Sequence, residues 1–464
     1  MSQNVKSAQK HLSLRRAISK RSFLLFTLAA GLIIGNRAPA QFTNGGFEIG
    51  PPGVPPPPWV VSTYMNYAGF NVQSPQTDEG LNLVDGGIAL TEVTNSPGGL
   101  DSAPDADLGT NASLRWPRYG YQCALINDNG RDYNVNSLSQ SAIVGGGMID
   151  PIDGQVHVTF VIAPVLENPY HETNAQPYYF IQLSDDTQDI ILYSDFGGLY
   201  DLDMPWQRDV VTNVTEYDFT DWQMVDIVPG TNVAMGDQIT LTAMASGCAL
   251  GGHMGQLYID GVGSSIDGIY MTGATAQAAM SGGNLAYKLT YRNGSPSAET
   301  GVVLCFNTPR NTTFQSLDAP GLAAVPPQVG TSGLVLCTLT NLEAGASGSF
   351  SVTVNINPGT IGAITARNYY IYSDLETPLL GPRLSTVVLN PILLCGPAVS
   401  GDGGLLFTFT NVPGTCFTVV STTNVSLPFS QWAVLGGAVE NTPGNYSFTD
   451  TVTNQERFYG VRSP

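Results

Sequence analysis

Aromatic and polar residues between positions 170 and 209 carry the most suggestive chemistry in this 464-residue sequence. Trp206, Arg208 and Asp209 lie in or beside the stretch MPWQR, which contains a proline and is expected to form a loop. Sugars bind proteins by laying an apolar face on an aromatic ring while polar groups take their hydroxyls. With Tyr170 and Tyr200, these residues predict a carbohydrate-binding platform. The alternative is that Trp206 folds onto its own sheet.

Histidine and cysteine side chains form a second reactive set. His171 precedes Glu172, but no second histidine follows at the spacing of a HExxH zinc protease, so the sequence excludes that class. His253 lies in the loop sequence GGHMG near Cys248, where a cysteine–histidine nucleophile is one interpretation and a disulfide at Cys248 is the favoured one. The sequence has no GxSxG elbow and no phosphate-binding Walker loop.

Acidic side chains leave a further possibility open. Asp195, Asp201 and Asp203 lie in the segment DFGGLYDLDM, which lacks the glycine and terminal glutamate of an EF-hand and is interpreted as a solvated acidic loop. Carboxylate pairs for glycoside hydrolysis are defined by a separation in space of roughly 5–9.5 Å, which a sequence does not reveal.

The N-terminal segment predicts export. Residues 1–22 are basic and polar, residues 23–35 form the apolar run FLLFTLAAGLIIG, and residues 36–40 end in small side chains. This order is that of a secretory signal peptide over residues 1–40, with cleavage before Gln41. The apolar run is too short for a standard membrane span, and no other stretch is long enough to cross a bilayer as a helix. The expected location is therefore secreted or at the cell surface.

The cysteine count agrees with export. An even number of cysteines, six, suggests disulfides in an oxidising compartment. We predict one bridge in each of three units, and the proposed pairs are Cys123–Cys248, Cys305–Cys337 and Cys395–Cys416.

Charge excludes some classes of partner. Seven of the 18 basic residues and none of the 37 acidic ones lie in residues 1–40, so the remainder carries 11 basic residues and a net charge near −26. Phosphate backbones and anionic membrane surfaces would repel such a chain, so nucleic-acid and membrane-surface binding are not expected.

Alternating hydrophobicity predicts the fold class. In residues 156–162 (VHVTFVI) and 350–356 (FSVTVNI) every second side chain is apolar, which is typical of half-buried antiparallel strands. Glycine, asparagine, proline and aspartate separate many such short segments, and no sustained 3.6-residue repeat occurs. We therefore predict an all-β, multi-domain β-sandwich protein.

Residues 41–265 resemble a known kind of domain. The opening NGGFE at 44–48, a tryptophan at 59 and the closing YIDGV at 258–262 are similar to the ends of galactose-binding-like jelly rolls, which include carbohydrate-binding modules of exported bacterial proteins. Such domains often hold a structural Ca²⁺ at their first and last strands. The resemblance implies that Glu48 and Asp260 are calcium ligands, since Ca²⁺ prefers oxygen donors. The alternative is that they are ordinary surface carboxylates or bond the local backbone.

Two further units follow. Residues 266–389, with YRNGSPSAETGVVL and LEAGASGSFSVTV, resemble the Ig-like repeat of bacterial envelope proteins, which is mostly a spacer. Residues 390–464 resemble a small C-terminal β-module of bacterial secreted proteins, expected to be a small β-sandwich.

Three functions are compatible with these features. The preferred one is a non-catalytic binding or adhesion protein of the cell surface that recognises carbohydrate or an envelope component through the jelly-roll loops. The second is a structural envelope or matrix protein without a small ligand, and the third is a carbohydrate-active enzyme in the first unit. The oligomeric state and the ligand are not evident from the sequence.

Overall fold

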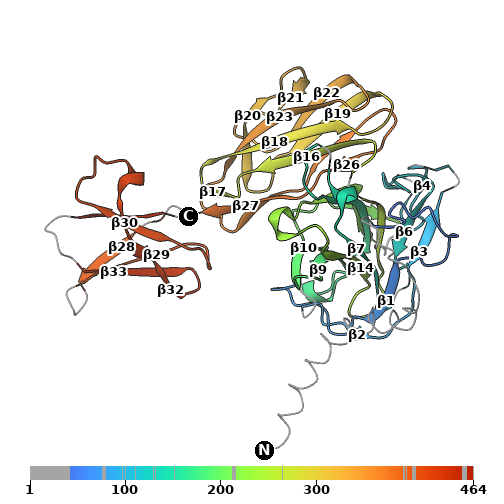
Figure 1. The fold of residues 1–464 in the computed structure, drawn as a ribbon, viewed down its shortest axis with the longest axis horizontal. Helices are drawn as coiled ribbons and strands as arrows, with labels where there is room; N and C mark the ends of the chain where they lie inside the picture. The colour runs from blue at the N-terminus through green and yellow to red at the C-terminus, as the bar shows by residue number, and fades with distance from the viewer. Residues whose placement is uncertain are drawn as a thin grey trace, which may run out of the picture.

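In the computed structural model, almost all regular secondary structure of the described residues is β-strand, which confirms the predicted fold class (Figure 1). It describes residues 42–462 except 76–79, 97, 100, 110, 129, 131, 151, 212–215, 264, 390–391, 393, 400–403 and 452–456. The predicted signal peptide lies outside the described residues. Among those described, helical structure is limited to four short 3-10 turns, Gly146–Met148, Thr173–Ala175, Gly230–Asn232 and Phe429–Gln431. In the same part of the chain, no helix has the length and apolarity needed to cross a membrane.

The first unit is a sandwich of two antiparallel layers. One layer has the strand order β10 (Ile190–Gly198), β9 (Tyr178–Asp185), β14 (Gln238–Ser246), β7 (Asn134–Ile143), β1 (Val60–Met65) and β2 (Val84–Asp85). The facing layer contains β13 (Trp222–Ile227), β8 (Val158–Glu167), β15 (Gly255–Gly263), β6 (Gln122–Ile126) and β3 (Glu92–Asn95). A hairpin of β11 (Gln207–Val210) and β12 (Glu216–Phe219) extends from the end of β8. Short β4 (Ala103–Pro104) and β5 (Arg115–Trp116) pair with each other.

The second unit shares a sheet with the first. β26 (Leu379–Leu380) pairs in parallel with β13, and the sheet continues through β25 (Tyr369–Tyr372), β19 (Glu299–Asn307), β22 (Leu334–Leu342) and β21 (Ala323–Val325). A second sheet has the order β16 (Ile269–Thr275), β18 (Asn284–Asn293), β23 (Ser347–Ile356) and β20 (Thr312–Asp318). A three-stranded sheet joins β17 (Ala278–Met280), β27 (Leu384–Leu389) and β24 (Ala363–Ala366).

The third unit has two small sheets of its own. One has the order β28 (Cys395–Val399), β29 (Leu405–Thr410), β33 (Asn445–Asp450) and β32 (Val439–Thr442). The other has the order β31 (Ala433–Gly437), β30 (Thr418–Thr422) and β34 (Phe458–Arg462). The rings of Phe409, Phe417 and Tyr446 pack at centroid distances of 4.9–5.2 Å and form its core. The finer family assignments of the three units, and their boundaries at 265/266 and 389/390, stay predictions.

β8 separates two hydrophobic cores. Val158, Phe160 and Ile162 face the interior of the first sandwich, as the alternation of residues 156–162 predicts. Val161, Ala163 and Val165 point the other way, into a core whose members come from both the first and the second unit. All ten residues of β8 are buried in consequence. Trp222, 1% exposed, belongs to this shared core.

Candidate functional site

Tyr170 lies in the segment that leaves β8, between the sheet and the β11–β12 hairpin. Its side chain is 63% exposed. Its backbone has the left-handed φ of +54°. A bulky residue rarely adopts this conformation, and such strain is concentrated at functional sites. The backbone N–H of Tyr170 donates to Oδ1 of Asn168 at 3.1 Å, which holds the turn. The chain thus presents an aromatic ring to solvent at a conformational cost.

Charged side chains of the β11–β12 hairpin fix this ring. The Arg208 guanidinium carbon lies 5.8 Å from the Tyr170 ring centroid, within cation–π range. Nε and Nη2 of Arg208 donate to Asp218 at 2.8 and 3.0 Å, and Nη1 donates to the Tyr170 hydroxyl at 3.2 Å. That hydroxyl in turn donates to Glu216, a bond that raises the pKa of Tyr170. We call Asn168, Tyr170, Arg208, Glu216 and Asp218 the Tyr170 surface.

Strand register explains this assembly. Arg208 is directly opposite Asp218 in the hairpin, and Glu216 is two residues away from Asp218, so the three side chains share one face. Asp218 also accepts from the Asn168 side chain at 2.8 Å, which ties the hairpin to the segment carrying Tyr170. Sequence reasoning missed Asn168, Glu216 and Asp218. The available signal was the two-residue spacing of Glu216 and Asp218 in a polar strand.

Tyr200 adjoins the same segment. Its hydroxyl donates to the backbone carbonyl of His171 at 2.7 Å and accepts from Nε2 of Gln176 at 3.1 Å. The side chain is 47% exposed. Tyr170, Tyr200 and Arg208, three of the five predicted platform residues, are therefore anchored to one segment, residues 168–176.

The other two platform residues lie elsewhere. Trp206 is half-buried and packs against the core of the first sandwich, the arrangement of the alternative interpretation. Its indole N–H is buried and has no hydrogen-bond partner among the described residues. The Asp209 carboxylate accepts from the backbone N–H of Gly109 and so holds a loop rather than facing Tyr170.

Both predicted calcium ligands accept hydrogen bonds from backbone N–H groups of residues 119–122, and Asp260 also accepts one from its neighbour Gly261. Oδ2 of Asp260 accepts from the N–H of Tyr119 at 2.8 Å, and its Oδ1 accepts from Gly261 at 2.7 Å. Oε1 of Glu48 accepts from Tyr121 and Gln122 at 2.7 and 3.1 Å. These N–H groups satisfy the carboxylate oxygens, as the alternative interpretation requires. Ca²⁺ is bound by oxygen ligands, and the groups that contact these carboxylates here are N–H donors instead. Calcium binding here stays a prediction from the resemblance.

The predicted disulfides are absent: none of the six cysteines forms one in the structure. Strand register explains the middle pair. Cys305 is opposite Leu336 and Cys337 is opposite Leu304, so the two thiols point to opposite faces of the sheet. Cys123 is on β6 within the core shared by the first two units, whereas Cys248 follows β14 in the other layer and contacts His253. Cys395 and Cys416 are both exposed in the third unit.

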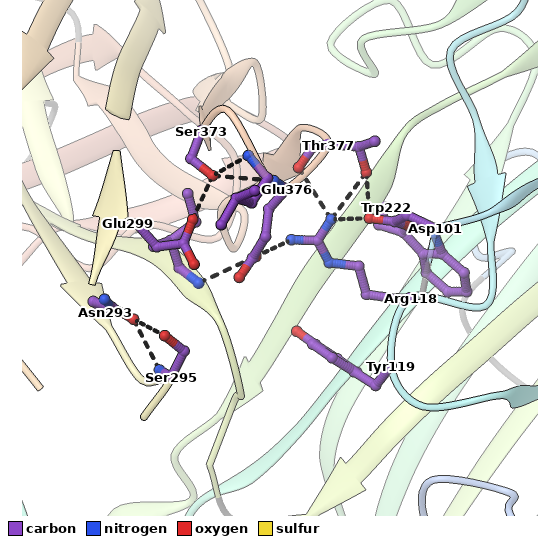
Figure 2. A network of polar contacts seen from close by, with 12 residues as sticks. Asp101, Arg118, Tyr119, Trp222, Asn293, Ser295, Glu299, Ser373, Glu376 and Thr377 are labelled. Carbon is purple, nitrogen blue, oxygen red and sulfur yellow. Dashed lines mark hydrogen bonds and ion pairs between the residues drawn. The ribbon is translucent and has the colours of Figure 1, made fainter. Parts of the chain in front are cut away.

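Two buried arginines join the first and second units. Arg118, whose side chain is fully buried, donates to Asp101 at 2.7 Å and to Glu376 at 2.8 Å, and it also bonds Thr377 (Figure 2). Arg367 makes a two-pronged contact with Asp195 at 2.7 and 3.3 Å. The interpretation of Asp195 as part of a solvated acidic loop is therefore wrong, because Arg367 and Arg383 cover its carboxylate.

A cavity of about 200 Å³ lies beside the second arginine contact. Its lining comes from both units and includes Asp195, Asp226, Arg367 and Arg383. Asp195 accepts from the two arginines, and Asp226 accepts from Nδ1 of His157 at 2.7 Å. The Asp195 contacts thus hold the two units together, whereas the bond between Asp226 and His157 lies within the first unit.

Raising the pH is expected to destabilise the protein through His157. Hydrogen bonding to Asp226, with Asp153 3.2 Å away on the other side, raises the pKa of His157 from 6.5 to about 9. The folded state therefore binds more protons than the unfolded state between these values, so this stabilisation is full below pH 6.5 and lost as pH rises through 9. We expect Tm to fall by roughly 2–4 °C across this range.

His157→Gln isolates the contribution of the histidine. Burial also raises the pKa of Asp101, Asp105 and Asp260, so these carboxyls lower stability with rising pH from about pH 4 upward. His157→Gln should keep the fall in stability that these carboxyls cause as the pH rises. It should lose the additional fall in stability between pH 6.5 and 9. Equal slopes for variant and parent, measured by thermal unfolding, would contradict the assignment.

Comparison with known proteins finds only weak structural similarities. No known protein family matches the sequence, and no curated protein matches it. A β-glucuronidase of glycoside hydrolase family 2 is 10% identical over 71% of this chain and 30% of its own, with a TM-score of 0.18. A β-1,2-glucanase from Parabacteroides distasonis is 9% identical over 66% of this chain and 37% of its own, with a TM-score of 0.20. The pilus backbone protein of Streptococcus pneumoniae is 9% identical over 73% of this chain and 84% of its own, with a TM-score of 0.13.

This chain thus spans about a third of the length of the two glycosidases. Scores of this size assign neither a fold family nor an activity.

Proposed function

We propose that this chain is an exported, non-catalytic binding protein that recognises carbohydrate through the Tyr170 surface. The observation that carries the proposal is the exposed Tyr170 ring, which a strained turn presents and Arg208 holds in place. Carbohydrate sites combine an exposed aromatic face with oriented polar groups at its edge. Here Glu216, Asp218 and Asn168 supply acceptors and donors around the ring.

Preorganisation supports binding at this surface. The side chains are already tied to one another by hydrogen bonds, so a ligand would not need to order them. The strong negative charge of the chain disfavours anionic polysaccharides and points to neutral glycans. An envelope polysaccharide of this kind would place the protein at the cell surface.

The engagement of the carboxylates supports a non-catalytic role. Both oxygens of Asp218 bond Arg208, and Glu216 accepts from the Tyr170 hydroxyl. A glycosidase needs one carboxyl that stays protonated and a second that is available as nucleophile or base. The Tyr170 surface uses its two carboxylates to position an aromatic ring instead.

Removing the Tyr170 ring is expected to abolish most of the binding. The full exported chain is run through native gels containing neutral polysaccharides, and the glycan that retards it is selected. Tyr170→Ala should weaken its affinity about tenfold or more, because a central aromatic contact is lost. Tyr121→Ala is the matched control, because Tyr121 is 66% exposed, bonds Glu48 through its backbone and is not part of the Tyr170 surface. The glycan affinity of this variant should change less than twofold.

Three outcomes would contradict the proposal. Unchanged affinity in Tyr170→Ala would show that the glycan binds elsewhere. Release of reducing sugar from the bound glycan would favour the enzyme interpretation. Absence of binding to any glycan, together with self-association of the chain, would favour the structural-protein interpretation.

A further inference from the structure

We infer that His171, Cys248 and His253 form a binding site for a divalent transition-metal ion of the zinc class. Their ligand atoms all lie within 4.8 Å of one another, and within the described residues they are the one group of three or more such side chains so arranged. The site is distinct from the Tyr170 surface and stands whether or not that surface binds glycan. Its ligands are two imidazole nitrogens and one sulfur, a set that zinc and related metals prefer.

The loop between β14 and β15 brings Cys248 and His253 together. The N–H of Cys248 donates to the carbonyl of His253 at 3.1 Å, and the N–H of Gly251 donates to the carbonyl of Cys248 at 3.2 Å. Gly251 and Gly252 have φ of +68° and +103°, conformations that favour glycine and allow the tight return. The Cys248 sulfur and Nδ1 of His253 are 3.4 Å apart as a result. Two such ligands on one tetrahedral zinc ion would be about 3.6 Å apart.

The third ligand comes from the segment 168–176. The N–H of Ala249 donates to the carbonyl of Ala175 at 3.0 Å, which ties this segment to the cysteine loop. The carbonyl of His171 accepts from Tyr200 and Gln176, so its backbone is also fixed. The rings of His171 and His253 are 5.0 Å apart at 78° to each other. The bond from Ala249 to Ala175 and the bonds to His171 are accepted by backbone carbonyl oxygens of residues 168–176. The imidazole of His171 is therefore not used by them and lies against the loop that carries Cys248 and His253.

An unpaired ring nitrogen of His171 is a second observation that points to a ligand here, separate from the distances. Nε2 of His171 is buried and has no hydrogen-bond partner among the residues that the structure describes. An unpaired buried polar atom is costly, and a bound metal ion would satisfy it. Three protein ligands leave the fourth position of a tetrahedral ion to water.

The site is tested with Co²⁺ and Zn²⁺ on the full exported chain under reducing conditions. One Co²⁺ per chain should produce a thiolate-to-metal charge-transfer band, and Zn²⁺ should displace it. Zn²⁺ should also raise Tm, because it binds the folded state. Cys248→Ser should lose the band and weaken zinc affinity at least about 100-fold, more than the usual effect of removing an outer contact. Cys416→Ser, which removes an exposed thiol elsewhere, should leave both unchanged.

Two further variants keep the test decisive if Cys248→Ser does not fold. His171→Gln and His253→Gln retain the thiol and should each lower zinc affinity and shift the cobalt spectrum. A folded parent chain with no thiolate band would overturn the inference, as would a band that persists in Cys248→Ser. Cobalt bound without sulfur ligation would show that surface carboxylates hold it, which also contradicts the proposed ligand set.

Discussion

Replacing Arg118 with methionine should lower the free energy of unfolding by about 3–5 kcal/mol. The side chain of Arg118 is fully buried between the first and second units and bonds Asp101 and Glu376 at once. The variant would leave both carboxylates buried without their cation, and that is the costly way to break a buried ion pair. Urea unfolding followed by tryptophan fluorescence measures the loss.

The pH dependence of Arg118→Met distinguishes charge from packing. Burial already raises the pKa of Asp101 and Glu376, and removal of the arginine would raise both pKa values further. Protonation at pH 5 should therefore restore part of the lost stability relative to pH 8. Arg310→Met, at an exposed arginine of the second unit, should change stability by less than about 0.5 kcal/mol. An equal loss at both pH values would contradict the electrostatic explanation.

Replacing Arg367 with methionine should cost roughly 3 kcal/mol. Its guanidinium, 6% exposed, bonds both oxygens of Asp195 across the junction of the two units. The expected loss is at the lower end of the range for a broken buried pair, because Arg383 still lies 3.1 Å from the same carboxylate. Denaturant unfolding of the full chain gives the value.

Arg383→Met is the matched control because it removes the other partner of the same aspartate. The Arg383 side chain is 45% exposed, so solvent screens its attraction and the loss should stay below about 1 kcal/mol. Equal losses in the two variants would show that burial of Arg367 does not decide its contribution.

Strand periodicity made the fold class predictable, and one strand shows where that reasoning ends. Residues 350–356 alternate, and β23 buries alternate side chains as predicted. Residues 156–160 alternate as well, but the sequence from Phe160 to Leu166 is continuously apolar because β8 passes between two cores. That change of pattern was the available signal that a second unit packs against the outer face of the first.

The candidate site was predictable only in part. Tyr170, Tyr200 and Arg208 were chosen by residue type, and the structure ties them to one segment. The role of Asp218 depends on its register opposite Arg208, and the meeting of His171 with Cys248 depends on a loop contact between distant positions. An even cysteine count suggested disulfides, but strand register places Cys305 and Cys337 on opposite faces. Spatial relations of this kind are not encoded in local patterns.

The most direct test of carbohydrate recognition is hydrogen exchange of the full chain with and without the selected neutral glycan. Binding at the Tyr170 surface predicts slower exchange in residues 168–176 and in the β11–β12 hairpin, because a bound ligand suppresses local opening of the elements it contacts. Exchange in β30 and β34 of the third unit should be unchanged. Protection confined to another region, with residues 168–176 unaffected, would contradict the assignment of the binding function to this surface.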